Sequence, residues 1–277
     1  MKRYILPTAY TEVQRYVTRD YQPTKLTYKE LLGTSKGYSV LLGKSTKWSL
    51  TNGIQEVKGM YLAPDKAVQG TNFCWNSGAC RLSCIRFTGH LGMNMPSHVK
   101  HDMHITERRT RALIEHTDRF LSQLIREMIA VSHDNLFIRL NGSSDIRWEY
   151  ILDLQALHDD FGLRFYDYTK IPLKARSPID GVYRLCYSYD EQTTASKRAS
   201  EYINAGYPVS ICMNEDDCKK AIKYGLVTDG DAHDIRFVDS GIVCLKYKKP
   251  TTKGVKRINT EFIQSFETCT TLTALTI

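Results

Sequence analysis

The chain has 277 residues, and its 38 Lys and Arg outnumber its 30 Asp and Glu, which gives a formal net charge of +8. With 42% hydrophobic and 25% charged residues, the composition excludes a disordered chain, and no apolar run reaches the roughly 18 residues that a membrane-spanning helix needs. The surplus of positive charge favours an anionic partner, such as nucleic acid or a nucleotide.

The N-terminus reads Met-Lys-Arg-Tyr-Ile-Leu-Pro-Thr and lacks the apolar segment and small-residue cleavage site of a secretory signal. We therefore expect a cytoplasmic protein without a membrane partner. In that compartment the eight cysteines should remain reduced thiols. The sequence leaves the oligomeric state open.

The first part of the chain, residues 1–70, contains two short strand candidates at 38–43 and 57–62, and we interpret it as a β-rich extension. Residues 71–96 are rich in Gly, Asn and Ser and predict a loop. The strongest helix prediction covers 106–131, where the apolar residues form one stripe and most of the arginines lie off it.

Strand and helix patterns alternate through the rest of the chain. Strands are predicted at 136–140, 163–166, 183–188, 207–213, 235–238 and 241–247. Helices are predicted at 148–160, 194–205 and 215–224. This alternation is typical of an α/β domain with a mostly parallel sheet, and about six strands fit a partial or distorted TIM-like barrel better than a complete eightfold one. We assign 71–277 to this domain.

The most specific motif is Cys74-Trp-Asn-Ser-Gly-Ala-Cys80-Arg-Leu-Ser-Cys84, a Cys-x5-Cys-x3-Cys cluster in the predicted loop. A flexible loop allows three thiolates to reach one metal centre. His90 could complete a Cys3His zinc site, or the thiolates could hold a [4Fe–4S] cluster with one iron left open, for which S-adenosylmethionine is a possible cofactor. Three ordinary loop cysteines are the alternative, and the sequence does not decide between zinc and iron–sulfur.

Polar side chains follow three of the predicted strands, and α/β folds place their sites at the carboxyl ends of strands. In the first segment, the residues that we expect to bind substrate are Arg139, Asn141, Ser144 and Arg147. Asp145 in the same segment is a candidate acid–base group. A helix cap and turn would also explain Ser144 and Asp145.

The second polar segment places an Asp, two Tyr and a Lys at a strand end. Asp167 is a candidate acid–base residue, Lys170 a candidate base or charge clamp, and Tyr168 a candidate substrate contact. An ordinary surface pair between Asp167 and Lys170 is the alternative.

The third polar segment has the acidic spacing of the start of a calcium loop, but Ser240 stands where an EF-hand needs Glu, which excludes that motif. Its paired carboxylates, Asp231 and Asp234, are catalytic candidates. The residues of this segment that we expect to contact substrate are Asp229, His233 and Arg236. A turn rich in Asp and Gly is the alternative.

Two basic segments are candidates for contacts with the phosphates of nucleic acid. The first lies at the start of the predicted helix and supplies Arg108 and Arg109. The second has no acidic residue, and its candidates are Lys248, Lys249, Lys253, Lys256 and Arg257. A solvated basic surface would produce the same pattern.

Five separate motifs stand out between roughly residues 70 and 250. They are Cys74-x5-Cys80-x3-Cys84, Arg108-Arg-Thr110, Arg139-Leu-Asn-Gly-Ser-Ser-Asp-Ile146, Phe165-Tyr-Asp-Tyr-Thr-Lys170 and Asp229-Gly-Asp-x-His-Asp234. Together they resemble an uncharacterised family of phage and prophage proteins. The resemblance implies a phage origin and expression in the cytoplasm of a bacterial host, and it brings no established activity.

Two better-known groups offer looser analogies at the level of the fold. Radical-SAM enzymes share a three-cysteine loop ahead of a helix and a partial α/β barrel, with a usual spacing of Cys-x3-Cys-x2-Cys. Guanine transglycosylases and their DNA-modifying phage relatives are zinc-bearing barrels with catalytic Asp residues, and their cysteines lie after the barrel.

These residues favour an enzyme with a Cys-bound metal or iron–sulfur centre that acts on a nucleic-acid base or a nucleotide, as in DNA modification. One alternative is a zinc enzyme similar to a DNA-guanine transglycosylase. The other is a non-catalytic nucleic-acid-binding or counter-defence protein with a structural metal site. The chain has no P-loop, dinucleotide fingerprint, Gly-x-Ser-x-Gly elbow or zinc-deaminase pattern, which argues against those enzyme classes.

Overall fold

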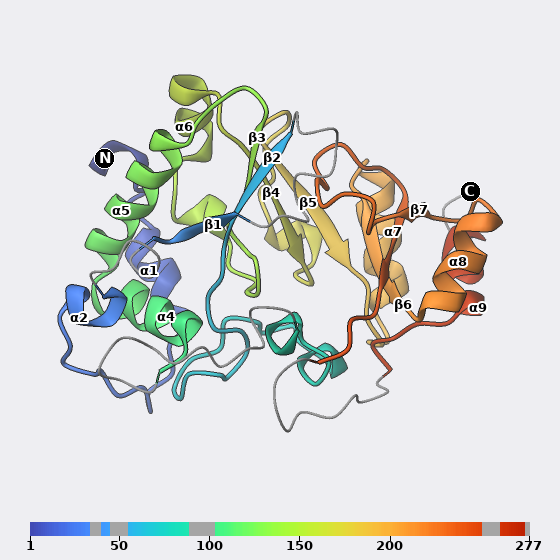
Figure 1. The fold of residues 1–277 in the computed structure, drawn as a ribbon, viewed down its shortest axis with the longest axis horizontal. Helices are drawn as coiled ribbons and strands as arrows, with labels where there is room; N and C mark the ends of the chain where they lie inside the picture. Colours follow the sequence, from blue (N-terminus) through green and yellow to red (C-terminus); the bar gives the residue numbers. More distant parts are fainter. Residues whose placement is uncertain (34–39, 45–54, 89–102, 251–260, 275–277) are drawn as a thin grey trace.

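A computed structural model describes residues 1–33, 40–44, 55–88, 103–250 and 261–274. Within these ranges the chain forms one eight-stranded sheet with helices packed beside it (Figure 1). The strands in sheet order are β1 (Leu42–Lys44), β2 (Glu56–Met60), β3 (Leu136–Arg139), β4 (Arg164–Thr169), β5 (Tyr183–Ser188), β6 (Val209–Met213), β8 (Ile242–Lys246) and β7 (Thr228–Asp229). Strand β1 is antiparallel to β2, and the other neighbouring pairs are parallel.

In space, the helices gather at the two ends of the sheet (Figure 1). Along the chain, several of them alternate with the parallel strands. The α-helices are α1 (Ala9–Gln14), α2 (Tyr28–Leu32), α4 (Ile105–Glu115), α5 (Thr117–Ala130), α6 (Leu154–Phe161), α7 (Ala195–Asn204), α8 (Glu215–Lys223) and α9 (Phe266–Ala274). The 3-10 helices are η1 (Lys2–Tyr4), η3 (Ala79–Arg81), η4 (Ile85–Phe87), η5 (Trp148–Tyr150) and η6 (Leu173–Ala175). In the described ranges, no helix combines the length and the apolar composition that crossing a membrane requires.

The order of the strands confirms the predicted α/β architecture with a mostly parallel sheet. From β2 to β6, neighbours in the sheet are also neighbours along the chain, as they are in a barrel. Within the described residues, however, β1 and β7 remain the two edges of the sheet. The structure is therefore an open sheet, and it does not contain the closed circle of strands that defines a TIM barrel.

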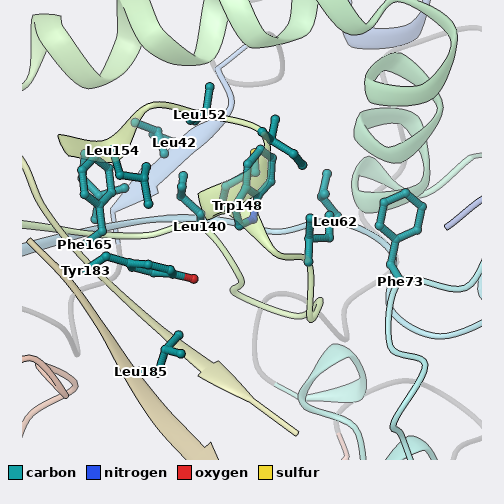
Figure 2. Packing of buried hydrophobic residues seen from close by; sticks show 14 of the residues in the cluster. Leu42, Leu62, Phe73, Leu140, Trp148, Leu152, Leu154, Phe165, Tyr183 and Leu185 are labelled. Carbon is teal, nitrogen blue, oxygen red and sulfur yellow. The ribbon is translucent and has the colours of Figure 1, made fainter. Parts of the chain in front are cut away.

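The two faces of the sheet are covered in different ways because successive side chains of a strand point to opposite faces. On β4, Phe165 packs into the large cluster that includes the helices, and Figure 2 shows it beside Leu154. The next residue, Tyr166, belongs to a small cluster on the other face, which Ile235 helps to cover. The segment after β7 thus closes the second face in place of a helix.

The N-terminal part departs from the β-rich extension that we expected for residues 1–70. It contains η1, α1 and α2, and its two strands, β1 and β2, belong to the main sheet. Val13, Leu31 and Leu62 lie in the same buried cluster as Leu121 of α5. The core is therefore continuous across the boundary that the sequence suggested.

Three predicted elements are corrected by the structure. The helix expected at 148–160 is the 3-10 helix η5 followed by the separate helix α6, whose N-cap is Asp153. The helix expected at 106–131 is two helices, α4 and α5, which meet at His116, where φ of −139° and ψ of 47° leave the helical region. The imidazole Nε2 of His116 lies 2.8 Å from the carbonyl oxygen of Leu26, a contact that holds the break. The strand expected at 235–238 is not formed, since the small cluster fixes this segment by burying Ile235.

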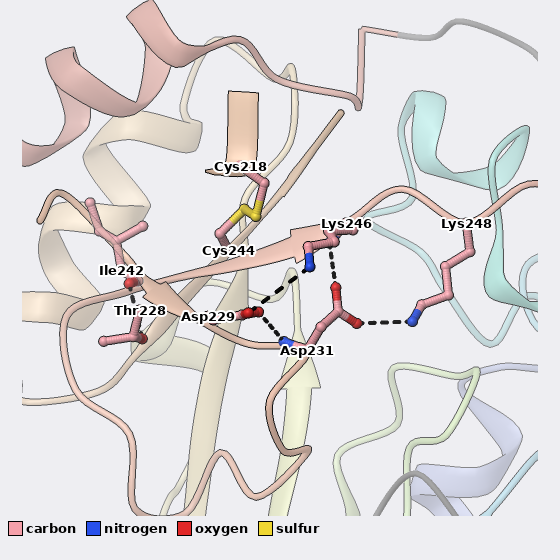
Figure 3. Close-up of a disulfide and its surroundings, with 8 residues drawn as sticks. All are labelled: Cys218, Thr228, Asp229, Asp231, Ile242, Cys244, Lys246 and Lys248. Carbon is pink, nitrogen blue, oxygen red and sulfur yellow. Dashed lines mark hydrogen bonds and ion pairs between the residues drawn. A yellow bond between two sulfur atoms is a disulfide. The ribbon is translucent and has the colours of Figure 1, made fainter. Parts of the chain in front are cut away.

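A disulfide joins Cys218 of α8 to Cys244 of β8 (Figure 3). Their Cα atoms are 6.1 Å apart, which is within the usual range for bonded cysteines. The prediction that all eight thiols stay reduced is therefore wrong for this pair. The other six cysteines are free thiols.

Candidate active site

A pocket of about 170 Å³ lies at the carboxyl ends of the central strands. Its wall is built from five parts of the chain: the segment after β2, the cysteine loop, which we define as residues 74–88, and the carboxyl ends of β3, β4 and β5 with the residues that follow β3 and β4. Parallel strands end at the same edge of a sheet, so the fold itself brings the parts at β2, β3, β4 and β5 together. Several of the residues that the sequence predicted as site residues line this pocket.

All three cysteines of the predicted cluster line this pocket. Burial raises the pKa of the Cys74 and Cys80 thiols, and it raises that of Cys84 to about 11. The positive charge of Lys170 opposes this effect at Cys80. Without a bound cation the three groups are therefore neutral thiols at pH 7, and a cation in the pocket would be needed to hold them as thiolates.

The predicted metal ligands are not arranged around one point. In the described ranges, no three His, Cys, Asp or Glu side chains are grouped so that they could hold a single metal ion. The proposed fourth ligand, His90, lies outside the described residues. The thiols thus share a pocket, and their arrangement is not that of a ready-made zinc site.

Asn141 organises the turn after β3 and has no hydrogen-bonding capacity left for a substrate. Its Oδ1 accepts from Ser144 Oγ, from the Ile146 amide and from Trp148 Nε1, at 2.9, 3.0 and 3.2 Å. Its Nδ2 donates to the Ile146 carbonyl and to Asp167. Because an amide oxygen has two lone pairs, this side chain is saturated. Asn141 and Ser144 line the pocket, and their side chains hold its wall.

Arg139 also holds the pocket wall in place through its own contacts. Its guanidinium donates to the Asn141 and Gly142 carbonyls, both at 3.3 Å, and forms an ion pair with Asp234 at 3.1 Å. It also stacks on the ring of Tyr168, with 4.4 Å between its central carbon and the ring centroid. Two predicted substrate contacts, Arg139 and Tyr168, therefore line the pocket as a preformed unit.

Asp145 and Lys170 come from neighbouring strand ends and are joined through the backbone. The Asp145 carboxylate accepts from the Lys170 amide at 2.8 Å and pairs with Arg176 at 3.3 Å. Burial raises the pKa of Asp145, and the charge of Arg176 opposes the rise. The Lys170 ammonium donates to the Ser188 carbonyl at 2.9 Å and pairs with the buried Asp190 at 3.3 Å. Both predicted catalytic residues line the pocket.

Asp167, by contrast, lies behind the pocket wall and does not line it. The carboxylate is fully buried and accepts from the Asn141 amide at 2.6 Å and from the Tyr183 hydroxyl at 3.0 Å. Burial raises its pKa to about 7, against the effect of these hydrogen bonds. The structure therefore corrects the prediction of a substrate-facing acid at this position, since Asp167 positions Asn141 instead.

The cysteine loop is held by Glu191 and Gln192, which follow β5. The sequence analysis identified neither residue. Glu191 accepts from the Ala79 amide at 2.5 Å, and Gln192 donates to the Asn76 carbonyl at 2.9 Å. A Cβ atom added at Gly78 would lie only 2.0 Å from Glu191 Oε1, so glycine is what permits this approach. An acidic residue three positions after a predicted strand was the only available signal.

The third polar segment does not reach the pocket within the described residues. Asp231 accepts from the Lys246 amide and from Lys248 Nζ, both at 2.9 Å, and so ties this segment to β8 (Figure 3). Asp229 accepts from the Asp231 amide, and Asp234 pairs with Arg139. These contacts are internal, contrary to the catalytic and substrate-binding roles that we expected for these carboxylates.

The remaining candidates of that segment are also engaged within the fold. The buried Arg236 guanidinium pairs with Asp239 and donates to the carbonyls of Gly230 and His233. The His233 imidazole lies 3.7 Å from Asp239. Neither Arg236 nor His233 lines the pocket, so the expectation that they contact substrate is not met there.

The predicted basic contacts fall into three groups. Arg108 and Arg109 of α4 are buried, with Arg108 only 1% exposed, which is contrary to a phosphate-binding surface. Arg147 forms a two-point ion pair with Glu12 at 2.5 and 2.9 Å, which joins the strand end to α1 instead of substrate. Of the C-terminal group, Lys248 pairs with Asp231, Lys249 is exposed, and the others lie outside the described residues, namely Lys253, Lys256 and Arg257.

Comparison with known proteins identifies the family. The chain matches the family model described as Gene product 88 over residues 24–265, which covers the whole pocket and most of the sheet. No curated protein and no solved structure matches the chain. The match confirms the resemblance to a phage-type family that the five sequence motifs indicated. The chain belongs to the Gene product 88 family.

Proposed function

We propose that this protein is a phage-encoded enzyme that uses an iron–sulfur cluster, bound by Cys74, Cys80 and Cys84, to modify a nucleic-acid base or a nucleotide. The observation that carries the proposal is the convergence of all three cysteines on one pocket with Asp145 and Lys170. Three half-buried thiols in a pocket that also holds a carboxylate and an ammonium group are typical of a reaction centre, and a purely structural metal site needs neither group.

The arrangement of the thiols favours a cluster over zinc. Around a tetrahedral zinc ion with Zn–S bonds of about 2.3 Å, neighbouring sulfurs lie about 3.8 Å apart, and all ligands point at one atom. In a [4Fe–4S] cluster each cysteine binds a different iron, so three sulfurs can surround a larger volume. The described residues contain no grouping suited to a single ion, whereas the three thiols all line one pocket, and this contrast is the reason for proposing a cluster.

Three cysteines leave one iron of such a cluster open, and when bound the cluster would supply one-electron chemistry to a ligand such as S-adenosylmethionine. The roles of the remaining pocket residues then follow from their surroundings. Asp145 has a pKa raised by burial and is suited to hold or transfer a proton beside the substrate. Lys170, fixed by Asp190 and Ser188, supplies a positioned positive charge for an anionic substrate group.

Iron analysis of anaerobically purified protein tests this proposal. We expect a coloured protein with about four iron and four sulfide per chain, lost in Cys80→Ala. Cys212→Ala is the matched control, because Cys212 is also a free, half-buried thiol and does not line the pocket. A colourless protein with one zinc per chain would instead support the transglycosylase-like alternative, and a chain that binds no metal after reconstitution would contradict the proposal.

The non-catalytic binding alternative has less support. It relied on two basic segments. In the first, Arg108 and Arg109 are buried in α4. In the second, Lys248 and Lys249 lie in the described residues, and Lys248 pairs with Asp231. This alternative also gives no reason for Asp145 to lie in the same pocket as the cysteines. Alanine at Asp145 that leaves both the cluster and turnover intact would remove Asp145 from the catalytic residues. Salt-dependent binding of nucleic acid without formation of any product would favour the non-catalytic alternative.

A further inference from the structure

The cysteine loop is unusual for the number of exposed apolar side chains that it carries. Trp75, Leu82 and Ile85 are 55%, 46% and 45% exposed, and they are three of the eight large apolar side chains that are exposed in the described residues. All three lie within eleven residues of each other. Ile85 itself lines the pocket, so the loop extends from the pocket to solvent at this residue.

Two arginines lie among these apolar side chains. Arg81 and Arg86 both line the pocket, Arg81 is exposed, and neither forms an ion pair within the described residues. Arg81 immediately precedes Leu82, and Arg86 immediately follows Ile85, so charge and apolar surface alternate along the loop. We call Trp75, Arg81, Leu82, Ile85 and Arg86 the rim.

The indole of Trp75 is held in place, although more than half of it is exposed. Its ring centroid lies 5.6 Å from that of Tyr16, and Tyr16 in turn stacks on the buried Phe73 at 5.2 Å. A supported aromatic ring that remains open to solvent is suited to stack on a planar group. Because the ring is already ordered, such stacking loses little side-chain entropy.

We propose that the rim binds single-stranded nucleic acid and presents one of its bases to the pocket. Bases stack on exposed aromatic side chains, and arginines neutralise the phosphates between them, which is the composition of the rim. A duplex would keep its bases paired and out of reach of Trp75. The inference rests on the proposed function, because it gives the pocket a polynucleotide substrate instead of a free nucleotide.

The charge of the rim also indicates which kind of molecule binds to it. The chain has a net charge of +8, and the rim carries two arginines and no acidic residue. A second copy of this chain would bring a rim of the same sign against it, which like-charge repulsion disfavours. A polyanion with planar apolar groups matches both features of the rim.

Fluorescence anisotropy with the full-length protein tests the proposal. The probe is a labelled oligothymidylate of about 15 nucleotides, with a matched duplex and thymidine monophosphate as competitors. We expect the single strand to bind more tightly than either competitor. Trp75→Ala should weaken this binding by about 5- to 150-fold, the range produced by the loss of one base–aromatic stack.

The arginines are tested through the salt dependence of the same binding. Neutralising both in Arg81→Ala/Arg86→Ala should reduce the slope of log affinity against log salt by about 1.4, which is roughly 0.7 for each phosphate of a single strand. Matched controls are Tyr224→Ala, an exposed aromatic residue directly after α8, and Arg119→Ala/Arg126→Ala, two exposed arginines of α5. These controls should bind as the unmodified protein does.

Three results would overturn the proposal: single strands that bind no more tightly than the competitors, rim variants that bind as the controls do, or a dimer that Trp75→Ala dissociates. The last result would assign the rim to a second copy of the chain. Iron content is measured on the same samples, so that the two proposals fail separately. A rim variant that loses strand binding and keeps iron supports the rim, whereas strand binding by a chain without iron contradicts only the cluster.

Discussion

The pocket and the segment after β7 contain the same kinds of residue and use them in opposite ways. Both are rich in Asp and Arg, and both follow strands of one sheet. At the pocket, buried networks hold a wall from which Asp145 and Lys170 face the cavity. After β7, the oxygens of Asp231 and Asp234 are occupied by the chain's own donors, and the segment serves to cover the second face of the sheet.

The comparison teaches that the partners of a polar residue, more than its type, decide whether it is available for chemistry. Asp231 is tied to Lys246 and Lys248 of the neighbouring strand and its extension. Asp145 is tied by the Lys170 amide and by Arg176, and still lines a cavity. The following predictions test whether the two regions differ as the contacts indicate.

The largest expected effect is a loss of stability when Arg176, which lies behind the pocket, is replaced. Arg176 is buried and pairs with Glu149 at 2.6 Å and with Asp145 at 3.3 Å, so Arg176→Met would remove the ion-pair partner of two carboxylates at once. Breaking such a pair costs about 3–5 kcal/mol, and urea unfolding would measure the loss. The matched variant is Arg236→Met, which removes the charge from only one carboxylate, Asp239. A loss at Arg236 as large as that at Arg176 would contradict the difference between the regions.

The second effect is a pH dependence that arises from Asp167. Burial raises its pKa from 3.8 to about 7, so the folded state binds a proton that the unfolded state has lost between these values. The free energy of unfolding should therefore fall as the pH rises from about 4 to about 7, by up to about 4 kcal/mol. Asp167→Asn should remove this part of the slope, as measured by urea unfolding at several pH values. An unchanged slope would show that the carboxyl ionises normally.

The sequence predicted the elements of this fold better than it predicted the site. The strand at 183–188 and the helix at 215–224 agree with β5 and α8 to within one residue, because hydrophobic period and capping residues are local signals. The open sheet and the break at His116 depend on distant contacts, such as that of His116 with Leu26. Local patterns do not contain such contacts.

The site shows the same division between local and distant information. The three cysteines and the strand-end Asp145 and Lys170 were recognised from residue type and position, and the pocket contains all of them. The saturation of Asn141 could not be recognised, because one of its partners, Asp167, belongs to the next strand. The contact of Glu191 with the cysteine loop could not be recognised either, because its partner Ala79 is 112 residues away along the chain.

Loss of the contact between Glu191 and the cysteine loop should give the smallest of the three effects, and the one most specific to the pocket. In Glu191→Ala the Ala79 amide loses a charge-assisted hydrogen bond, which contributes about 1.5–3 kcal/mol and holds Cys80 next to it. We expect lower iron occupancy after anaerobic reconstitution, with a modest loss of thermal stability. Glu191→Gln keeps an acceptor oxygen and should restore most of the occupancy, because the contact needs an acceptor and not a charge. If both variants bind iron as the unmodified chain does, the loop is held by its other contacts, and Glu191 does not position the cysteines.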